Sequence, residues 1–229
     1  TGDYLASQHI VCIGAQESGK STLISTIIAG LTQIGRERAR LVVIDHRRSH
    51  LGAIDPDMLA GYSASTQETE KLVAAMKITL EERLPSAEVT PQQLKDRSWW
   101  TGPDIFLIVD NLDLVADMAF APLLSVLPHA RDVGLHVVIT RKSGGCVRAL
   151  FQPFLAEIKD QSPFIIVLDA DKDDGPLFGV RLKPQPPGRG VMIHHGTQQG
   201  LIQIAAADMP EVSEAVSYTH LTLPTICSV

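Results

Sequence analysis

One short segment of the chain, residues 14–21, restricts both its own backbone and the elements on either side of it. The segment fits the pattern G-x-x-x-x-G-K-[ST], and its residues are Gly14, Ala15, Gln16, Glu17, Ser18, Gly19, Lys20 and Ser21. The apolar run at 9–13 predicts a buried strand before it, and 22–29 predicts a helix after it. A strand, a glycine-rich loop and a helix in this order are typical of a loop that binds nucleotide phosphates.

The chemistry of this loop assigns a role to each part of it. The glycines let consecutive backbone N–H groups point at phosphate oxygens, and the helix N-terminus adds about half a positive charge. We therefore expect residues from Gly14 to Thr22 to bind ATP, with Lys20 at the β and γ phosphates and the Ser21 hydroxyl on Mg²⁺. The Glu17 side chain is expected to point away from the phosphates. The alternative is a strand-to-helix turn that binds nothing.

Strand and helix patterns alternate along the rest of the chain. Strands are predicted at 40–45, 104–110, 135–140 and 164–168, and helices from Thr66, at about 118–131 and at about 147–155. Pro85 and Pro91 indicate an irregular connection. Two short strands at 191–194 and 201–204 are expected to form a hairpin with 195–199 as its turn. The prediction is an α/β fold with a mostly parallel sheet and helices on both faces.

Length, charge and termini narrow the class of protein. At 229 residues, the chain is ordinary for one α/β domain, which we place at residues 1–215. The chain begins with Thr1, so we expect a piece of a longer polypeptide, and no apolar stretch reaches the roughly 20 residues that span a bilayer. A net charge of −6 argues against nucleic acid as the main partner. Residues 216–229 carry no charged residue and resemble a translated sequencing adapter, so we predict a non-native tail there, with a genuine tail as the alternative.

The three cysteines, Cys12, Cys146 and Cys227, are far apart in the chain and form no C-x-x-C pair. This spacing argues against a zinc site and a disulfide framework, and it fits a reducing cytoplasm. Cys12 lies in the predicted first strand, so we expect it to pack in the core.

Two further positions are the last residues of predicted strands and are candidates for catalysis together with Lys20. Asp110 ends an apolar strand, where the Mg²⁺-binding aspartate of P-loop ATPases stands, and the alternative is an aspartate that only caps the strand end. Thr140 ends the next strand and is either a γ-phosphate sensor or a turn former. The residue after Asp110 is Asn111, where many ATPases of the additional-strand class carry a glutamate that activates water. Losing a general base costs about 10²–10⁴ in rate, so we expect slow hydrolysis unless Asp113 substitutes for it.

Several arginines are candidates for reaching the phosphates of a neighbouring domain, although each is more often a solvated surface residue. They are Arg47, Arg48, Arg141, Arg148 and Arg189. The loop Ser143-Gly144-Gly145 either responds to nucleotide or is a simple turn.

An ordered set of motifs resembles one family. Besides the loop at 14–21, these are VIDHRRS at 43–49, SWWTGPD at 98–104, LPHARDVGLH at 127–136 and PPGRG at 186–190. Together they resemble the C-terminal ATPase domain of EccC, the FtsK/SpoIIIE-type motor of actinobacterial type VII (ESX) secretion. The resemblance covers about residues 9–205.

The resemblance implies a RecA-like P-loop NTPase fold of the additional-strand class. It also implies tandem ATPase domains in one motor, held by a membrane complex at the cytoplasmic face of the cell membrane. The last domain of the family is implied to bind the helical C-terminal signal peptide of a secreted substrate. Two alternatives stay open: a DNA-translocating motor of the FtsK branch, and a non-catalytic module that ATP stabilises.

Overall fold

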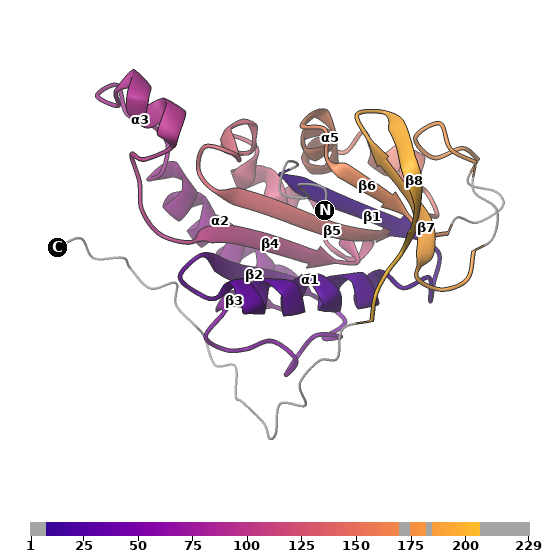
Figure 1. Ribbon diagram of the computed structural model, residues 1–229. Helices are drawn as coiled ribbons and strands as arrows, with labels where there is room; N and C mark the ends of the chain where they lie inside the picture. Colours follow the sequence, from indigo (N-terminus) through magenta and orange to yellow (C-terminus); the bar gives the residue numbers. More distant parts are fainter. Residues whose placement is uncertain (1–7, 170–174, 182–184, 207–229) are drawn as a thin grey trace.

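A computed structural model describes residues 8–169, 175–181 and 185–206. These residues form one eight-stranded sheet in the order β3-β2-β4-β5-β1-β6-β7-β8 (Figure 1). The strands are β1 His9–Gly14, β2 Ala39–Asp45, β3 Leu59–Ser63, β4 Asp104–Asp110, β5 Leu135–Lys142, β6 Phe164–Val167, β7 Arg189–His194 and β8 Thr197–Gln203. The pairings from β3 to β6 are parallel, and β7 and β8 extend the sheet antiparallel.

Helices cover both faces of this sheet. The α-helices are α1 Lys20–Ile34, α2 Thr66–Glu81, α3 Pro91–Asp96, α4 Cys146–Ala149 and α5 Pro153–Asp160, and the 3₁₀ helices are η1 Leu112–Leu114, η2 Asp117–Leu123 and η3 Leu127–His129. In Figure 1, α1 runs along the near face while α2 and α5 lie behind the sheet. The predicted mostly parallel sheet with helices on both faces is therefore confirmed.

Strand residues alternate between two cores, as the two-residue period of a strand requires. On β4, Leu107 and Val109 pack with α2, η2 and α5, whereas Ile108 packs with α1 on the opposite face. On β5, Val137 packs in the core with α2, η2 and α5, and Val138 packs in the core with α1. Both faces of the central strands are buried, which explains their continuous apolar sequences.

Two predicted helices are wrong in detail because prolines divide them. The helix predicted at about 118–131 is instead η2 and η3, with Pro122 inside the first and Pro128 at the start of the second. The helix predicted at about 147–155 is two helices, since Pro153 begins α5. Proline has no backbone N–H to donate within a helix, so it favours new starts and short turns. The hairpin turn is also shorter than predicted, because β8 begins at Thr197.

Three elements, β3, α3 and the single turn η1, have no counterpart in the prediction. The short strand β3 contains Ala60 and Gly61, which are weak strand formers, and it is held by parallel pairing to β2. The short helix α3 lies in the connection predicted as irregular. Its Thr90 and Gln93 form a capping box, in which each side chain binds the other residue's backbone N–H.

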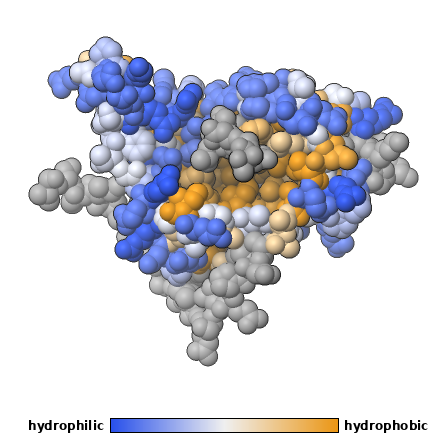
Figure 2. Space-filling model, in the orientation of Figure 1, coloured by the Kyte–Doolittle hydropathy of each residue, from blue (hydrophilic) through white to orange (hydrophobic). Residues whose placement is uncertain are grey.

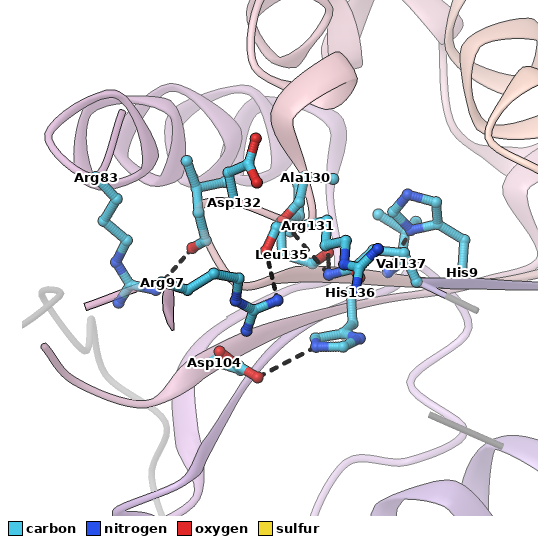
Figure 3. A network of polar contacts seen from close by, with 12 residues as sticks. His9, Arg83, Arg97, Asp104, Ala130, Arg131, Asp132, Leu135, His136 and Val137 are labelled. Atoms are coloured by element: carbon cyan, nitrogen blue, oxygen red, sulfur yellow. Dashed lines mark hydrogen bonds and ion pairs between the residues drawn. The ribbon is translucent and has the colours of Figure 1, made fainter. Parts of the chain in front are cut away.

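The N-terminal ends of the central strands meet in a polar network, at the edge of the sheet opposite residues 14–21 (Figure 3). Asp104 at the start of β4 lies 3.3 Å from His136 Nε2 on β5. Arg97 donates a 2.9 Å hydrogen bond to the carbonyl of Arg131, and Arg83 donates a 3.1 Å bond to the carbonyl of Val133. These contacts tie the connection before β5 to its neighbours.

The near face of the molecule exposes apolar side chains beside α1, because this helix covers only part of the sheet (Figure 2). Partly buried residues on this face include Ile10 and Phe106. Within the described residues, no helix combines the length and the apolar character needed to cross a membrane.

Candidate nucleotide-binding site

The predicted phosphate loop joins β1 to α1, as the pattern requires. β1 ends at Gly14 and α1 begins at Lys20, so the helix N-terminus faces the same edge of the sheet as the loop. Gly19 precedes the helix with φ 104°, a backbone region that favours glycine. A Cβ at Gly19 would also lie 2.9 Å from the backbone nitrogen of Gly188, so this position has no room for a side chain. The exposed Glu17 adopts φ 59° within the same turn.

The Lys20 side chain folds back against the loop. Its ammonium donates hydrogen bonds to the carbonyl oxygens of Gly14, at 3.0 Å, and Ala15, at 2.6 Å. Burial lowers the pKa of Lys20, while the carboxylates of Asp110 and Asp113 act in the opposite direction. The loop therefore holds its one lysine as a fixed donor at the floor of the site.

A cavity of about 660 Å³ opens directly above this loop. It collects side chains from four different connections at the C-terminal ends of the parallel strands, where ligands bind in open α/β sheets. Its lining comprises Ala15, Gln16, Glu17, Ser18, Gly19, Lys20, Ser21, Thr22, Arg47, Ser49, Asn111, Asp113, Leu114, Lys142, Ser143 and Gly144. The loop residues predicted from the sequence, from Ala15 to Thr22, therefore share one cavity.

Asp110 lies at the end of β4, and β5 separates this strand from β1. Its buried carboxylate has three polar neighbours: Oδ2 accepts a 3.4 Å hydrogen bond from Ser21 Oγ, and Oδ1 accepts a 2.5 Å bond from Thr140 Oγ1. His50 Nε2 lies 3.3 Å from Oδ2. Burial alone would raise the pKa of Asp110, but His50, Thr140 and Ser21 together lower it below its usual value. Asp110 is therefore an anion at neutral pH.

Ser21 and Asp110 fit a magnesium ion, because both offer the hard oxygen donors that Mg²⁺ prefers. The buried Ser18 Oγ in the same loop has no hydrogen-bond partner, which leaves a polar atom for a ligand or its water to satisfy. No cluster of three or more His, Cys, Asp or Glu that suits a metal occurs in the described part of the chain. A magnesium ion held here would take its remaining ligands from phosphates and water, as is common for Mg²⁺.

His50 is a site residue that the sequence analysis missed. It is 2% exposed, and its backbone N–H donates a 2.8 Å hydrogen bond to Asp45 Oδ2 at the end of β2. Tyr62 Oη donates to the same oxygen at 3.0 Å. No motif identifies His50, because it reaches Asp110 only through the pairing of β2 with β4.

Thr140 lies between β4 and β1, as a sensor should, but it is fully buried and does not line the cavity. Its hydroxyl donates to Asp110 and accepts a 2.8 Å hydrogen bond from the Asn111 backbone N–H. The observed role of Thr140 is thus to hold the end of β4. Contact with a γ phosphate stays a prediction.

The backbone turns immediately after Asp110. Asn111 adopts the left-handed conformation, with φ 58° and ψ 64°, and Asp113 lies in η1. Asn111 and Asp113 therefore do not share one face of a strand, because β4 has already ended. Both residues nevertheless line the cavity, and Lys142 Nζ lies 3.5 Å from Asp113 Oδ2.

The five candidate arginines occupy different places. Arg47 lines the cavity, and Arg48 and Arg148 are exposed elsewhere on the surface. Arg189 donates a 3.3 Å hydrogen bond to Gln203 on the hairpin, and Arg141 is half-buried. All five arginines lie within the described residues, and Arg47 is the only one of the five that lines the cavity.

Cys12 is fully buried between the sheet and α1, which confirms its predicted place in the core. Burial raises the pKa of its thiol to about 12, so it is unreactive at neutral pH. Cys146 is also buried. Cys227 and the predicted tail at 216–229 lie outside the described residues.

No protein-family model matches the chain, but individual proteins do. The ESX-4 secretion system protein EccC4 of Mycobacterium tuberculosis is 37% identical over 213 residues, which are 91% of this chain and 17% of that protein. The ESX secretion system protein EccC of Thermomonospora curvata is 40% identical over 208 residues, 89% of this chain and 16% of that protein. The chain thus spans about one sixth of the length of these curated relatives.

A solved structure extends the likeness to three dimensions. T. curvata EccC, ATPases 2 and 3, in complex with a signal sequence peptide, matches with a TM-score of 0.82 and 38% identity. The match covers 90% of this chain and 38% of that one. The fold is the RecA-like α/β fold of these P-loop ATPase domains, as predicted.

Proposed function

The chain belongs to the EccC family of type VII secretion ATPases, as one of its ATPase domains, and we propose that it binds Mg·ATP and docks secreted substrates. The observation that carries the nucleotide proposal is the shared cavity, in which the loop at 15–22 faces Asn111, Asp113 and Lys142. Lys20 would contact the β and γ phosphates, and Ser21 and Asp110 would hold the magnesium ion. When bound, that ion neutralises phosphate charge.

Hydrolysis by this domain alone is proposed to be slow. Asn111 offers an amide where a water-activating carboxylate would stand, and an amide is not a base at neutral pH. Asp113 is the alternative base. Its carboxylate lies 3.5 Å from the Lys142 ammonium, and this ion pair competes with an attacking water for the carboxylate. ATP would then act mainly by occupancy, setting the conformation of the domain within the motor.

The proposed docking partner is the helical signal peptide of a secreted protein. The support is the solved EccC structure that holds a signal sequence peptide, at 38% identity to this chain. A helix docks through apolar anchors, so the receptor must expose apolar side chains. Met118 on η2 is 77% exposed, and Phe151, between α4 and α5, is 80% exposed. We assign these two residues to the docking surface.

The wider setting is proposed from the family. The chain would work beside other ATPase domains of the same motor, and a membrane complex would hold that motor at the cytoplasmic face through parts of the full protein outside this chain. Nucleic acid is not expected as a partner, given the net charge of −6.

Calorimetry with Mg·ATP tests the nucleotide proposal. The wild-type domain should bind, and Lys20→Ala should lose about tenfold or more in affinity, because a charge-assisted contact contributes about 1.5–3 kcal/mol. Lys159→Ala is the matched control, since Lys159 is a half-buried lysine of α5 in an ion pair with Asp160 outside the cavity. Absence of binding by folded wild-type protein at millimolar ATP would overturn the proposal.

Turnover and peptide binding separate the alternatives. ATP that copurifies unhydrolysed favours the ATP-stabilised module, whereas DNA-stimulated hydrolysis favours the DNA motor.

Fluorescence anisotropy with a labelled helical signal peptide tests the docking surface. The affinity for the peptide should fall about tenfold in Phe151→Ala, as for a truncated anchor at an interface. Leu201→Ala, which removes an apolar residue 72% exposed on β8, should leave binding unchanged. If Phe151→Ala and Leu201→Ala lose peptide affinity equally, the assignment of the docking surface is wrong.

A further inference from the structure

An ion pair between two residues that line the cavity lies beside the phosphate loop. Lys142 Nζ lies 3.5 Å from Asp113 Oδ2, and the Lys142 backbone N–H donates a 3.1 Å hydrogen bond to Asp113 Oδ1. The two side chains differ in environment, since that of Lys142 is 60% exposed and that of Asp113 only 7%. The carboxylate is therefore fixed, and the ammonium is free to move on a flexible stem.

The sheet register places Lys142 next to the phosphate loop. In the parallel pairing of β1 with β5, Lys142 lies opposite Gly14, the first residue of the loop. The next residue strengthens this junction, because the backbone N–H of Ser143 donates a 3.2 Å bond to the Gly14 carbonyl. Lys142 at the end of β5 and Lys20 at the start of α1 thus line one cavity.

Side chains of both charges line the cavity around the Lys142–Asp113 pair. Lys20, Lys142 and Arg47 bring positive charge to the cavity, and Asp113 and Glu17 bring negative charge. A phosphate entering the cavity would compete with Asp113 for the Lys142 ammonium.

We propose that Lys142 is a specificity-determining residue that leaves Asp113 for the terminal phosphate of a nucleoside triphosphate. The inference rests on the proposed nucleotide function of the cavity. A diphosphate lacks the group that Lys142 would reach, so its binding leaves the Lys142–Asp113 pair closed. The main-chain bond from Lys142 to Asp113 Oδ1 persists in both states, which lets the side chain move without displacing β5.

Substitutions of Lys142 and Asp113 should change the ATP affinity relative to ADP in opposite directions. Removing the ammonium in Lys142→Ala should weaken ATP binding about fivefold, the modest effect of a partly exposed charged contact, and change ADP binding less than twofold. Asp113→Asn removes the competing negative charge and keeps an oxygen acceptor for the Lys142 N–H. It should tighten ATP binding about threefold relative to ADP.

The experiment is calorimetric titration of the whole chain with Mg·ATP and with Mg·ADP, on wild type and both variants. Lys159→Ala serves as the control, because it opens an ion pair of the same 3.5 Å length on α5. Urea unfolding of each variant verifies that it is folded. The expected result is a lowered ATP-to-ADP affinity ratio in Lys142→Ala and a raised ratio in Asp113→Asn.

The outcomes separate this inference from the proposed function. If wild type binds neither nucleotide, the proposed function fails. If wild type binds both but Lys142→Ala changes ATP and ADP affinities by the same factor, or by none, the inference is overturned and nucleotide binding stands. A weaker ATP affinity in folded Asp113→Asn also overturns it, since that result makes Asp113 a supporting ligand rather than a competitor.

Discussion

Replacing Thr140 with valine should destabilise this domain more than its small change in shape suggests. The Thr140 hydroxyl is fully buried and serves two other buried groups. It donates the 2.5 Å bond to Asp110 Oδ1, and it accepts the 2.8 Å bond from the Asn111 backbone N–H. Valine removes both contacts at once and supplies only a methyl group in their place.

The expected loss follows from the groups left behind. A buried polar group deprived of its partner costs about 1–3 kcal/mol, and a charged one lies toward the upper end. Asp110 retains contacts from Ser21 and His50, which offset part of its loss. We therefore expect the free energy of unfolding to fall by about 3 kcal/mol in Thr140→Val. Thr140→Ser keeps the hydroxyl and loses one methyl group, so it should cost about 1 kcal/mol.

The assay is urea unfolding followed by circular dichroism at neutral pH, without nucleotide, on wild type and both variants. The difference between valine and serine isolates the hydroxyl from the methyl group. If Thr140→Val is no less stable than Thr140→Ser, the hydroxyl does not support the end of β4, and the argument from these two hydrogen bonds is refuted.

Two more predictions concern positions that do not line the cavity. Burial lowers the pKa of His9 from 6.5 to about 4, so between these pH values the unfolded chain binds a proton that the folded chain excludes, and stability falls as the pH falls. Between pH 7.5 and 5.5, His9 should lower the free energy of unfolding by about 1 kcal/mol, and His9→Gln should not show this loss. If the stability of His9→Gln falls with pH as steeply as that of wild type, the lowered pKa of His9 is not the cause. At Gly190, an added Cβ would lie 2.6 Å from the Cα of Leu168, so Gly190→Ala should lower the melting temperature by several degrees. Gly196→Ala, with a positive φ and nothing within 4 Å of an added Cβ, is its control and should change the melting temperature less.

The chain's local patterns predicted the central strands and the phosphate loop because both depend on neighbouring residues. β4 matches the predicted strand at both ends, since a continuous apolar run buried on two faces leaves little ambiguity. The apolar content of 118–131 outweighed Pro122 and Pro128 in the prediction, and the helix there was wrong for that reason. The strand β3 was missed because its stability comes from pairing with β2 rather than from its own residues.

By itself, the sequence determined that a phosphate loop lies between a strand and a helix, because the spacing of Gly14, Gly19 and Lys20 is a local property of the backbone. Only the tertiary structure decided which side chains face that loop. His50 reaches Asp110, and Lys142 reaches Asp113, because β2 pairs with β4 and β5 enters between β4 and β1. Strand order arises from contacts between residues far apart in the chain, and no spacing within one segment encodes it.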